Sequence, residues 1–166
     1  MRAVVQRVSG AEVRVGGVAV GRIGAGLVVL LGVGRADEAG TAEALAMKIA
    51  RLRIFADEAG RTNRSLLDVR GACLVISQFT LYADTRRGRR PGFTNAAPPE
   101  TAEPLCERFV ESLDEIGIET AKGRFGSAME VELVNDGPFT IWLDSEASAV
   151  GTGDEAANAD RRGPSG

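Results

Sequence analysis

The sequence predicts a single α+β domain in which largely antiparallel β-sheets pack against two main helices. Several segments rich in β-branched residues follow one another with short turns between them, a spacing that is typical of hairpins. Two longer segments instead repeat apolar residues every three or four positions, which is typical of amphipathic helices. With 166 residues, the chain is long enough to bury the core of one such domain.

The predicted strands are spread along the whole domain. The chain should open with a hairpin, because Gly16-Gly17 is a two-residue turn signal between segments that favour strands. Gly26–Val33 is a continuous apolar run and therefore predicts a strand that is buried on both faces. The remaining expected strands are Ala3–Val8, Ala11–Val15, Val18–Ile23, Arg53–Phe55, Cys73–Phe79, Met129–Val134 and Phe139–Leu143.

Two helices are expected from the apolar spacing. The first should run roughly from Glu38 to Leu52, with Asp37 or Thr41 able to cap its first turn. The second should cover about Pro99–Ile116, since proline suits the first position of a helix.

The segments outside these elements are predicted to be a long loop and a C-terminal tail. Asp84–Pro99 shows little periodicity and predicts a long loop, and loops of this length are usually functional or disordered. Residues 1–144 should form the domain, whereas residues 145–166 are rich in Ala, Gly, Ser and acids and predict a disordered tail. The N-terminus lacks the apolar stretch of a signal peptide, so we expect a cytoplasmic protein.

The composition excludes several kinds of catalysis. The chain contains no histidine, which rules out Ser-His-Asp and Cys-His machinery. Its two cysteines, Cys73 and Cys106, should be reduced, partly buried thiols. Because they are far apart in sequence and no histidine is present, we expect no metal site. Neither a phosphate-binding loop nor a dinucleotide fingerprint occurs, and we expect no cofactor. An enzyme built from this chain must therefore work with hydroxyls, amides, carboxylates, arginines or backbone groups.

The strongest catalytic candidate interrupts an apolar run. Ser77, Gln78, Phe79 and Thr80 place hydroxyl and amide groups at the end of the predicted central strand. A strand end with polar caps is the plain alternative. The functional interpretation is a cluster aimed at a polarised carbonyl, with backbone N–H groups forming an oxyanion hole.

Two further segments are candidates for binding. Asn135–Thr140 contains Gly137 and Pro138 and could be a simple turn; a cis bond before proline is found in only about 5–6% of cases, so the sequence does not decide it. The net charge is −3, yet four arginines gather in one loop, where they could be solvated or could contact RNA phosphates. These arginines are Arg86, Arg87, Arg89 and Arg90.

Together, these segments resemble the D-aminoacyl-tRNA deacylase family over about residues 1–144. The motifs that carry the resemblance are Gln6-Arg7-Val8, Gly24-Ala25-Gly26-Leu27, Arg53-Ile54-Phe55, Ser77-Gln78-Phe79-Thr80-Leu81, Arg90-Pro91-Gly92-Phe93, Gly123-Arg124-Phe125-Gly126 and Asn135-Asp136-Gly137-Pro138. The resemblance implies a deacylase-type fold and hydrolysis of the ester bond of D-aminoacyl-tRNA, which releases the D-amino acid and tRNA. It also implies activity on glycyl-tRNA mischarged on tRNA-Ala.

The resemblance further implies a homodimer with tRNA as partner. A Gly137-Pro138 dipeptide with a cis peptide bond would enter the pocket of the partner subunit, where its carbonyls reject L-amino acids and Arg7 holds it in place. Ser77, Gln78, Phe79 and Thr80 would form the other wall. Since no histidine can deprotonate Thr80, we expect backbone groups of Phe79 and Thr80 to hold the carbonyl. The 2′-hydroxyl of the terminal ribose would then help to activate water.

Three other interpretations stay open. A related editing enzyme clears L-alanine from tRNA for threonine, but its Gly-Pro bond is trans, and the Ser77-Gln78 pair favours the D-specific enzyme. An RNA-binding module around Arg86–Arg90 would bind tRNA without ester turnover. A dimeric structural protein would show neither property.

Overall fold

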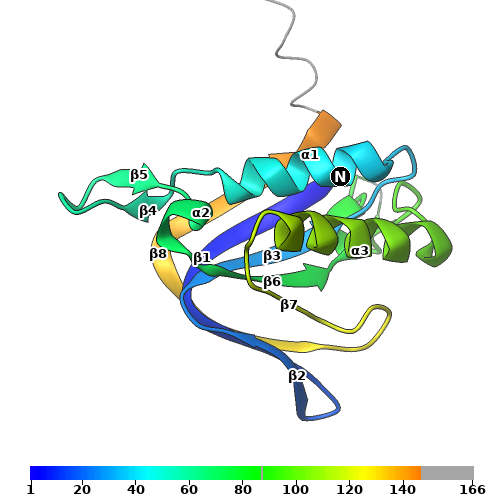
Figure 1. The fold of residues 1–166 in the computed structure, drawn as a ribbon. Coiled ribbons are helices and arrows are strands. Elements are labelled where there is room, and N and C mark those ends of the chain that lie inside the picture. The colour runs from blue at the N-terminus through cyan, green and yellow to red at the C-terminus, as the bar shows by residue number, and fades with distance from the viewer. Residues whose placement is uncertain (87, 147–166) are drawn as a thin grey trace, which may run out of the picture.

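The computed structural model describes residues 1–86 and 88–146. Most of the predicted tail and Arg87 lie outside these residues. One curved, mixed sheet has the strand order β2 (Val18–Ile23), β1 (Arg2–Val15), β3 (Gly26–Gly32), β6 (Ala72–Ser77) and β7 (Thr120–Lys122), and β8 (Glu130–Asp144) pairs with β1. A small separate hairpin, β4 (Phe55–Ala56) with β5 (Thr62–Arg64), projects from one end of the molecule (Figure 1).

The expected antiparallel pairing holds for three of the five strand pairs in this sheet. β1 runs antiparallel to β2, β3 and β8, whereas β6 runs parallel to both β3 and β7. The parallel pairs arise because the chain leaves β3, crosses the sheet through helix α1 (Ala39–Ala50) and only then enters β6. The α+β class is therefore right, and the sheet is mixed.

Two helices cover one face of the sheet, as the two apolar repeats predicted (Figure 1). α1 buries Leu45 and Ile49, and α3 (Pro99–Glu115) buries Phe109 and Leu113 in the same core. The cap prediction for α1 is wrong, since the helix begins after Glu38 and has no side-chain cap.

A third helix, α2 (Leu66–Val69), was not foreseen because four residues are too few to show a periodicity. A capping box stabilises it: the Ser65 hydroxyl accepts from the Asp68 N–H, and the Asp68 carboxylate accepts from the Ser65 N–H. In the part of the chain that the structure describes, no helix is long and apolar enough to span a membrane.

The largest correction concerns β8. We expected two strands joined by a turn, but Glu130–Asp144 is one strand that pairs along the whole of β1. The turn residues are accommodated by a register shift, in which Thr140 faces Gln6 and Asn135 faces Val8. Asp136–Phe139 therefore bulges out of a continuous ladder, because long-range pairing with β1 outweighs the local turn signal.

Two strand boundaries also change. β4 begins only at Phe55, so the predicted Arg53–Phe55 strand is largely loop. β6 ends at Ser77, because the chain turns into the 3₁₀ helix η1 (Phe79–Tyr82). The opening hairpin forms as predicted, with Gly16 at φ 58° and Gly17 at φ 79°, the left-handed conformations that a tight hairpin turn requires.

Candidate active site

The first catalytic candidate lies where β6 gives way to η1. The Gln78 N–H donates to the Leu31 carbonyl at 2.7 Å and closes the ladder between β6 and β3. Immediately beyond it, the Leu81 N–H donates to the Gln78 carbonyl at 3.2 Å and forms the tight turn of η1. The polar residues that interrupt the apolar run thus end the strand instead of continuing it.

Neighbouring side chains fix η1 in place. The Arg2 guanidinium donates to the Leu81 carbonyl at 3.0 Å and lies 4.4 Å from the centre of the Tyr82 ring. The Tyr82 hydroxyl donates to Asp37 at 3.3 Å, and burial together with the Asp37 charge raises the pKa of Tyr82. A strand terminus that is anchored on both sides can hold its backbone N–H groups in a set direction.

The hydroxyl of Thr80 accepts a hydrogen bond from the Gln78 side-chain amide. The N–H groups of Phe79 and Thr80 precede the first hydrogen bond inside η1, and no described residue accepts from either of them. Phe79 and Thr80 are both exposed. The strand end therefore offers two unused backbone donors beside a hydroxyl and an amide.

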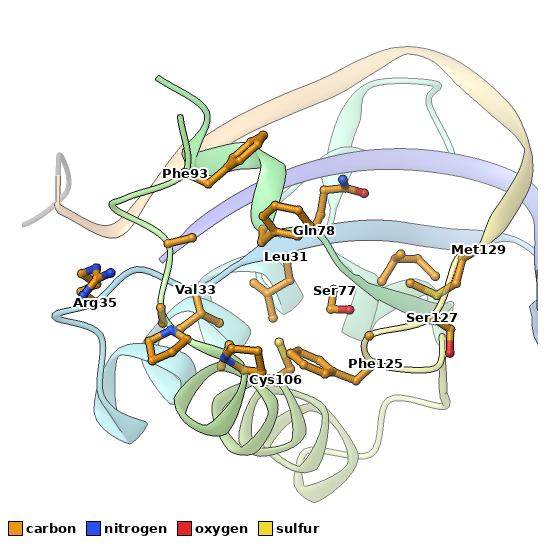
Figure 2. Close-up of a pocket in the computed structure, with 18 of the residues that line it drawn as sticks. Leu31, Val33, Arg35, Ser77, Gln78, Phe93, Cys106, Phe125, Ser127 and Met129 are labelled. Carbon is orange, nitrogen blue, oxygen red and sulfur yellow. The ribbon is translucent and has the colours of Figure 1, made fainter. Parts of the chain in front are cut away.

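A large, mostly apolar pocket of about 630 Å³ opens next to this strand end (Figure 2). Ser77, Gln78 and Phe79 line it, whereas Thr80 does not. The opposite walls come from the segment before α3, from α3 itself and from residues 125–131. Phe93 packs edge-on against Phe79 with ring centres 5.0 Å apart, so the long loop contributes to the same pocket.

The two cysteines are poorly suited to act as nucleophiles. Cys106 lines the pocket, but burial raises the pKa of its thiol to about 12. Burial also raises the pKa of Cys73 to about 12. Both thiols stay protonated near neutral pH, as expected of structural cysteines, and are poor nucleophiles.

The second candidate, Gly137-Pro138, lies on the exposed bulge of β8. Its peptide bond is cis. Neither residue lines the pocket of its own chain, so a single chain does not bring this dipeptide together with Ser77–Thr80. Two side chains hold the bulge: the Asn135 amide donates to the Arg7 carbonyl at 2.8 Å and to the Phe139 carbonyl at 3.3 Å.

Arg7 is the other anchor. Its guanidinium donates to the Asp136 carbonyl at 3.1 Å, to the Gly137 carbonyl at 3.3 Å and to the Ile54 carbonyl. It also pairs with the Asp136 carboxylate at 2.9 Å and lies 4.3 Å from the centre of the Phe139 ring. A side chain that is only 11% exposed thus holds the two backbone carbonyls that precede Pro138 and contacts the Phe139 ring that follows it.

The basic loop offers fewer free charges than its sequence suggests. Arg86 donates to both oxygens of Asp84, at 2.9 and 2.7 Å, and this pairing lowers the pKa of Asp84. Arg89 and Arg90 are exposed, and neither forms an ion pair with an acid among the described residues. The loop closes through mutual backbone hydrogen bonds between Asp84 and Gly92, and it ends beside the pocket at Phe93.

The comparison with known proteins decides the family. The sequence matches the D-Tyr-tRNA(Tyr) deacylase family over residues 4–144. The chain belongs to this family. A D-aminoacyl-tRNA deacylase of Roseiflexus castenholzii is 62% identical over 145 residues, which cover 87% of this chain and 92% of that protein. One of Symbiobacterium thermophilum is 62% identical over 146 residues, covering 88% and 97%. The resemblance stated from the motifs is thereby confirmed.

Solved structures agree with this fold. A structure titled c-Myc DNA Unwinding Element Binding Protein aligns with a TM-score of 0.81 at 40% identity, covering 87% of this chain and 98% of that one. A probable eukaryotic D-amino acid tRNA deacylase aligns with a TM-score of 0.76 over 86% of this chain and 97% of that one. At 16% identity, the second likeness concerns the fold alone.

Several pocket residues of this deacylase-family chain were not foreseen. Arg35, Ser127 and Met129 line the pocket but carry no recognisable motif in the sequence. Phe125 belongs to a shared motif to which no role was assigned, and that motif was the one signal that could have found this wall. The walls come from segments far apart in sequence, and only the fold brings them together.

Proposed function

We propose that this chain hydrolyses the ester bond of D-aminoacyl-tRNA and releases a free D-amino acid and tRNA. Family membership supports this function, and one observation carries it: the polar strand end Ser77–Thr80 adjoins an apolar pocket of about 630 Å³. A pocket of this size suits the aminoacylated end of a nucleic acid, because ligand sites are mostly apolar with a few placed polar groups. The domain that carries the activity spans residues 1–144, and the reaction belongs to the cytoplasm, where aminoacyl-tRNA is used.

In the proposed reaction, water attacks the ester carbonyl carbon. The N–H groups of Phe79 and Thr80 hold the carbonyl oxygen as negative charge develops on it. The bond from the carbonyl carbon to the ribose oxygen then breaks, and the proton from water ends on that oxygen. The terminal 2′-hydroxyl, adjacent to the ester, helps to orient and activate the water.

The Thr80 hydroxyl is a supporting group in this scheme. Its oxygen accepts from the Gln78 amide, which is a donor and cannot act as a base. The chain has no histidine to take a proton from Thr80. Ser77, Gln78 and Thr80 therefore shape and polarise the site, while position and electrostatics drive the chemistry.

The chirality filter is proposed to come from a second copy of the chain. Gly137-Pro138 stands out of β8 and lies outside its own chain's pocket, as a group that serves a partner would. β8 is an edge strand of 15 residues with an exposed outer face, and Val134 and Trp142 on it are 63% and 51% exposed. Long exposed edges with apolar side chains favour pairing with another chain. Phe79, 58% exposed at the pocket mouth, would be covered by the same contact.

In this arrangement, the carbonyls of the dipeptide occupy the space that an L side chain would need. A D side chain points elsewhere, and glycine has no side chain to clash, so glycyl-tRNA mischarged on tRNA-Ala is also a proposed substrate. Arg7 acts as a positioning residue, because it donates to the carbonyls of Asp136 and Gly137.

The arginine loop is proposed to contact tRNA phosphates. Arg89 and Arg90 are exposed and lie on the loop that ends at the pocket, whereas Arg86 is bound to Asp84. Arg87, which was predicted with them, lies outside the described residues. The same loop favours the second candidate function, RNA binding without turnover.

Single-turnover hydrolysis of D-tyrosyl-tRNA, L-tyrosyl-tRNA and L-alanyl-tRNA for threonine, each in the presence of EDTA, separates these functions. Fast loss of only the D-ester supports the proposal, and persistence of activity in EDTA supports chemistry without a metal. Equal rates of hydrolysis for the D- and L-tyrosyl esters would contradict the proposed chirality filter. Tight tRNA binding with no loss of either ester would favour the RNA-binding function, and loss of L-alanyl ester alone would favour the related editing enzyme.

A further inference from the structure

One charged side chain lies on the rim of the pocket. Arg35 follows β3, and it is the only Asp, Glu, Lys or Arg among the described residues that line the cavity. Figure 2 shows Arg35 at one end and Ser127 and Met129 at the other. An otherwise uncharged, elongated pocket therefore has a cation at one end.

The backbone around Arg35 is firmly held. Its N–H donates to the Asn95 carbonyl at 3.3 Å, and Gly34 forms an isolated bridge with Ala96. The side-chain Nε donates to the Thr94 carbonyl. These bonds join the segment after β3 to the segment before α3, so the guanidinium is directed by two walls of the pocket.

The charge of Arg35 is not neutralised by the protein. Within residues 1–86 and 88–146, Arg35 forms no ion pair. The nearest acid in sequence, Asp37, is already engaged by the Gly34 N–H at 2.6 Å and by the Tyr82 hydroxyl. With Nε bound to a carbonyl, the two terminal nitrogens remain for a ligand. A guanidinium fork of this kind matches the oxygens of a phosphate.

The end of the pocket away from Arg35 is lined by uncharged side chains. Ser77 and Ser127 supply hydroxyls there, and Phe125 and Met129 supply an aromatic ring and a polarisable sulfur. These groups suit a flat heterocycle with hydrogen-bonding edges. Gln78 and Phe79 of the strand end line the same pocket and follow Ser77 directly in the chain.

A nucleotide fits this order of groups. The base leaves the ribose at C1′ and the 5′-phosphate arm leaves it at C4′, with the ring oxygen between these two carbons, while an ester on the 3′-oxygen leaves it at C3′. With the base at the Ser77–Ser127 end and the ester at the strand end, the 5′-phosphate points to the Arg35 rim. We propose that Arg35 binds the 5′-phosphate of the terminal nucleotide and so positions the ester against Phe79 and Thr80. This inference rests on the proposed function.

The role differs from that of Arg89 and Arg90. Those residues lie outside the pocket, so they would contact phosphates further along the tRNA and affect only long substrates. Arg35 instead acts on the last nucleotide alone. Its effect should therefore appear in a substrate of one nucleotide and should depend on whether that nucleotide carries a 5′-phosphate.

The test compares two small substrates, the 3′-D-tyrosyl ester of adenosine and the same ester of adenosine 5′-monophosphate. For the wild type, the phosphate should lower KM. In Arg35→Gln, KM for the phosphorylated ester should rise about ten-fold or more, the range for a charge-assisted hydrogen bond, while kcat changes little. For the ester without phosphate, KM of the same variant should stay within about two-fold of the wild-type value, since no contact to the substrate is lost. KM of Arg35→Lys for the phosphorylated ester should lie between the values of the wild type and Arg35→Gln, because lysine keeps the charge but not the forked arrangement of donors.

Arg61→Gln is the matched control, since Arg61 is 78% exposed on the β4–β5 hairpin and does not line the pocket. Equal effects of Arg35→Gln on both esters, or none on either, would overturn the phosphate contact. Failure of the wild type to cleave either ester and D-tyrosyl-tRNA as well would refute the proposed function instead. Competition between adenosine and adenosine 5′-monophosphate for binding then still decides the role of Arg35: a preference for the monophosphate that Arg35→Gln removes supports it, and no preference overturns it.

Discussion

Arg7→Ala should lower the rate of D-ester hydrolysis and weaken the preference for D over L, because Arg7 holds the bulge that carries Gly137-Pro138. The variant loses hydrogen bonds to the carbonyls of Asp136 at 3.1 Å and Gly137 at 3.3 Å. Bonds to a charged donor contribute about 1.5–3 kcal/mol each, and these are long enough to take the lower figure. The ion pair with Asp136, a carboxylate that is 55% exposed, adds only about 0–1 kcal/mol.

Together, the Arg7 contacts stabilise the ordered bulge by roughly 3 kcal/mol. The hydrogen bonds of the Asn135 amide remain in the variant and keep part of this order. Since about 1.4 kcal/mol is a factor of ten in rate, kcat/KM for D-tyrosyl-tRNA should fall between about 10-fold and 100-fold. The rate on the L-ester should stay level or rise, because the proposed filter would exclude L side chains less well once it is loosened. The ratio of the two rates is therefore the informative quantity.

The assay is single-turnover hydrolysis of both esters by the wild type, Arg7→Ala and Arg14→Ala. Arg14 lies on the same strand, pairs with Glu12 and Glu132 and is far from the bulge, so it controls for the loss of an arginine. Thermal unfolding of each variant is measured alongside, because the Ile54 carbonyl loses its donor in Arg7→Ala, at about 1–3 kcal/mol. An unchanged D-to-L ratio in a folded Arg7→Ala protein would refute the positioning role.

Three other predictions use the same assays. Thr80→Ala should keep its activity within about ten-fold, because it loses one neutral hydrogen bond and no base; a loss of several orders of magnitude in single turnover would make Thr80 a nucleophile. Combined Arg89→Gln and Arg90→Gln should weaken tRNA binding and reduce its salt dependence, yet leave hydrolysis of an aminoacyl-adenosine unchanged; equal losses on both substrates would contradict this. Cys73 and Cys106 should resist alkylation at pH 8 in the folded protein, since burial raises the pKa of each thiol from 9.0 to about 12. Unfolded thiols lose protons first, so the free energy of unfolding should decrease as pH rises from about 9 towards 12; denaturant titrations at pH 8 and pH 10 check the sign.

Much of the local structure followed from the sequence alone. Leu45 and Ile49 gave the spacing of α1, and Phe109 and Leu113 that of α3, because a helix buries one stripe wherever it packs. The Gly16-Gly17 turn was equally local, since both residues adopt the left-handed conformation that glycine permits. The lack of histidine likewise limits the possible chemistry through composition alone, whatever fold the chain adopts.

The candidate site residues were predicted from motifs, and their arrangement was not. Asn135–Pro138 has the composition of a turn, but pairing with β1 on both sides turns it into a bulge within one strand. The polar run after Ile76 was predicted as strand up to Phe79, whereas its end forms η1, which Arg2 and Asp37 hold through Leu81 and Tyr82. In both places, a partner distant in sequence overrides the local preference.

The pocket depended on the tertiary structure most of all. Its walls come from the end of β3, the end of β6, the segment entering α3 and residues 125–131. The parallel placement of β6 between β3 and β7 brings the first two together, and the packing of α3 over the sheet adds the third. Spacing along a chain records which residues share a face of one element, but not which elements become neighbours. The sequence thus determined the family, the two main helices and the polar residues at the strand end, while the fold alone decided that Arg35 and Ser127 stand at opposite ends of one cavity.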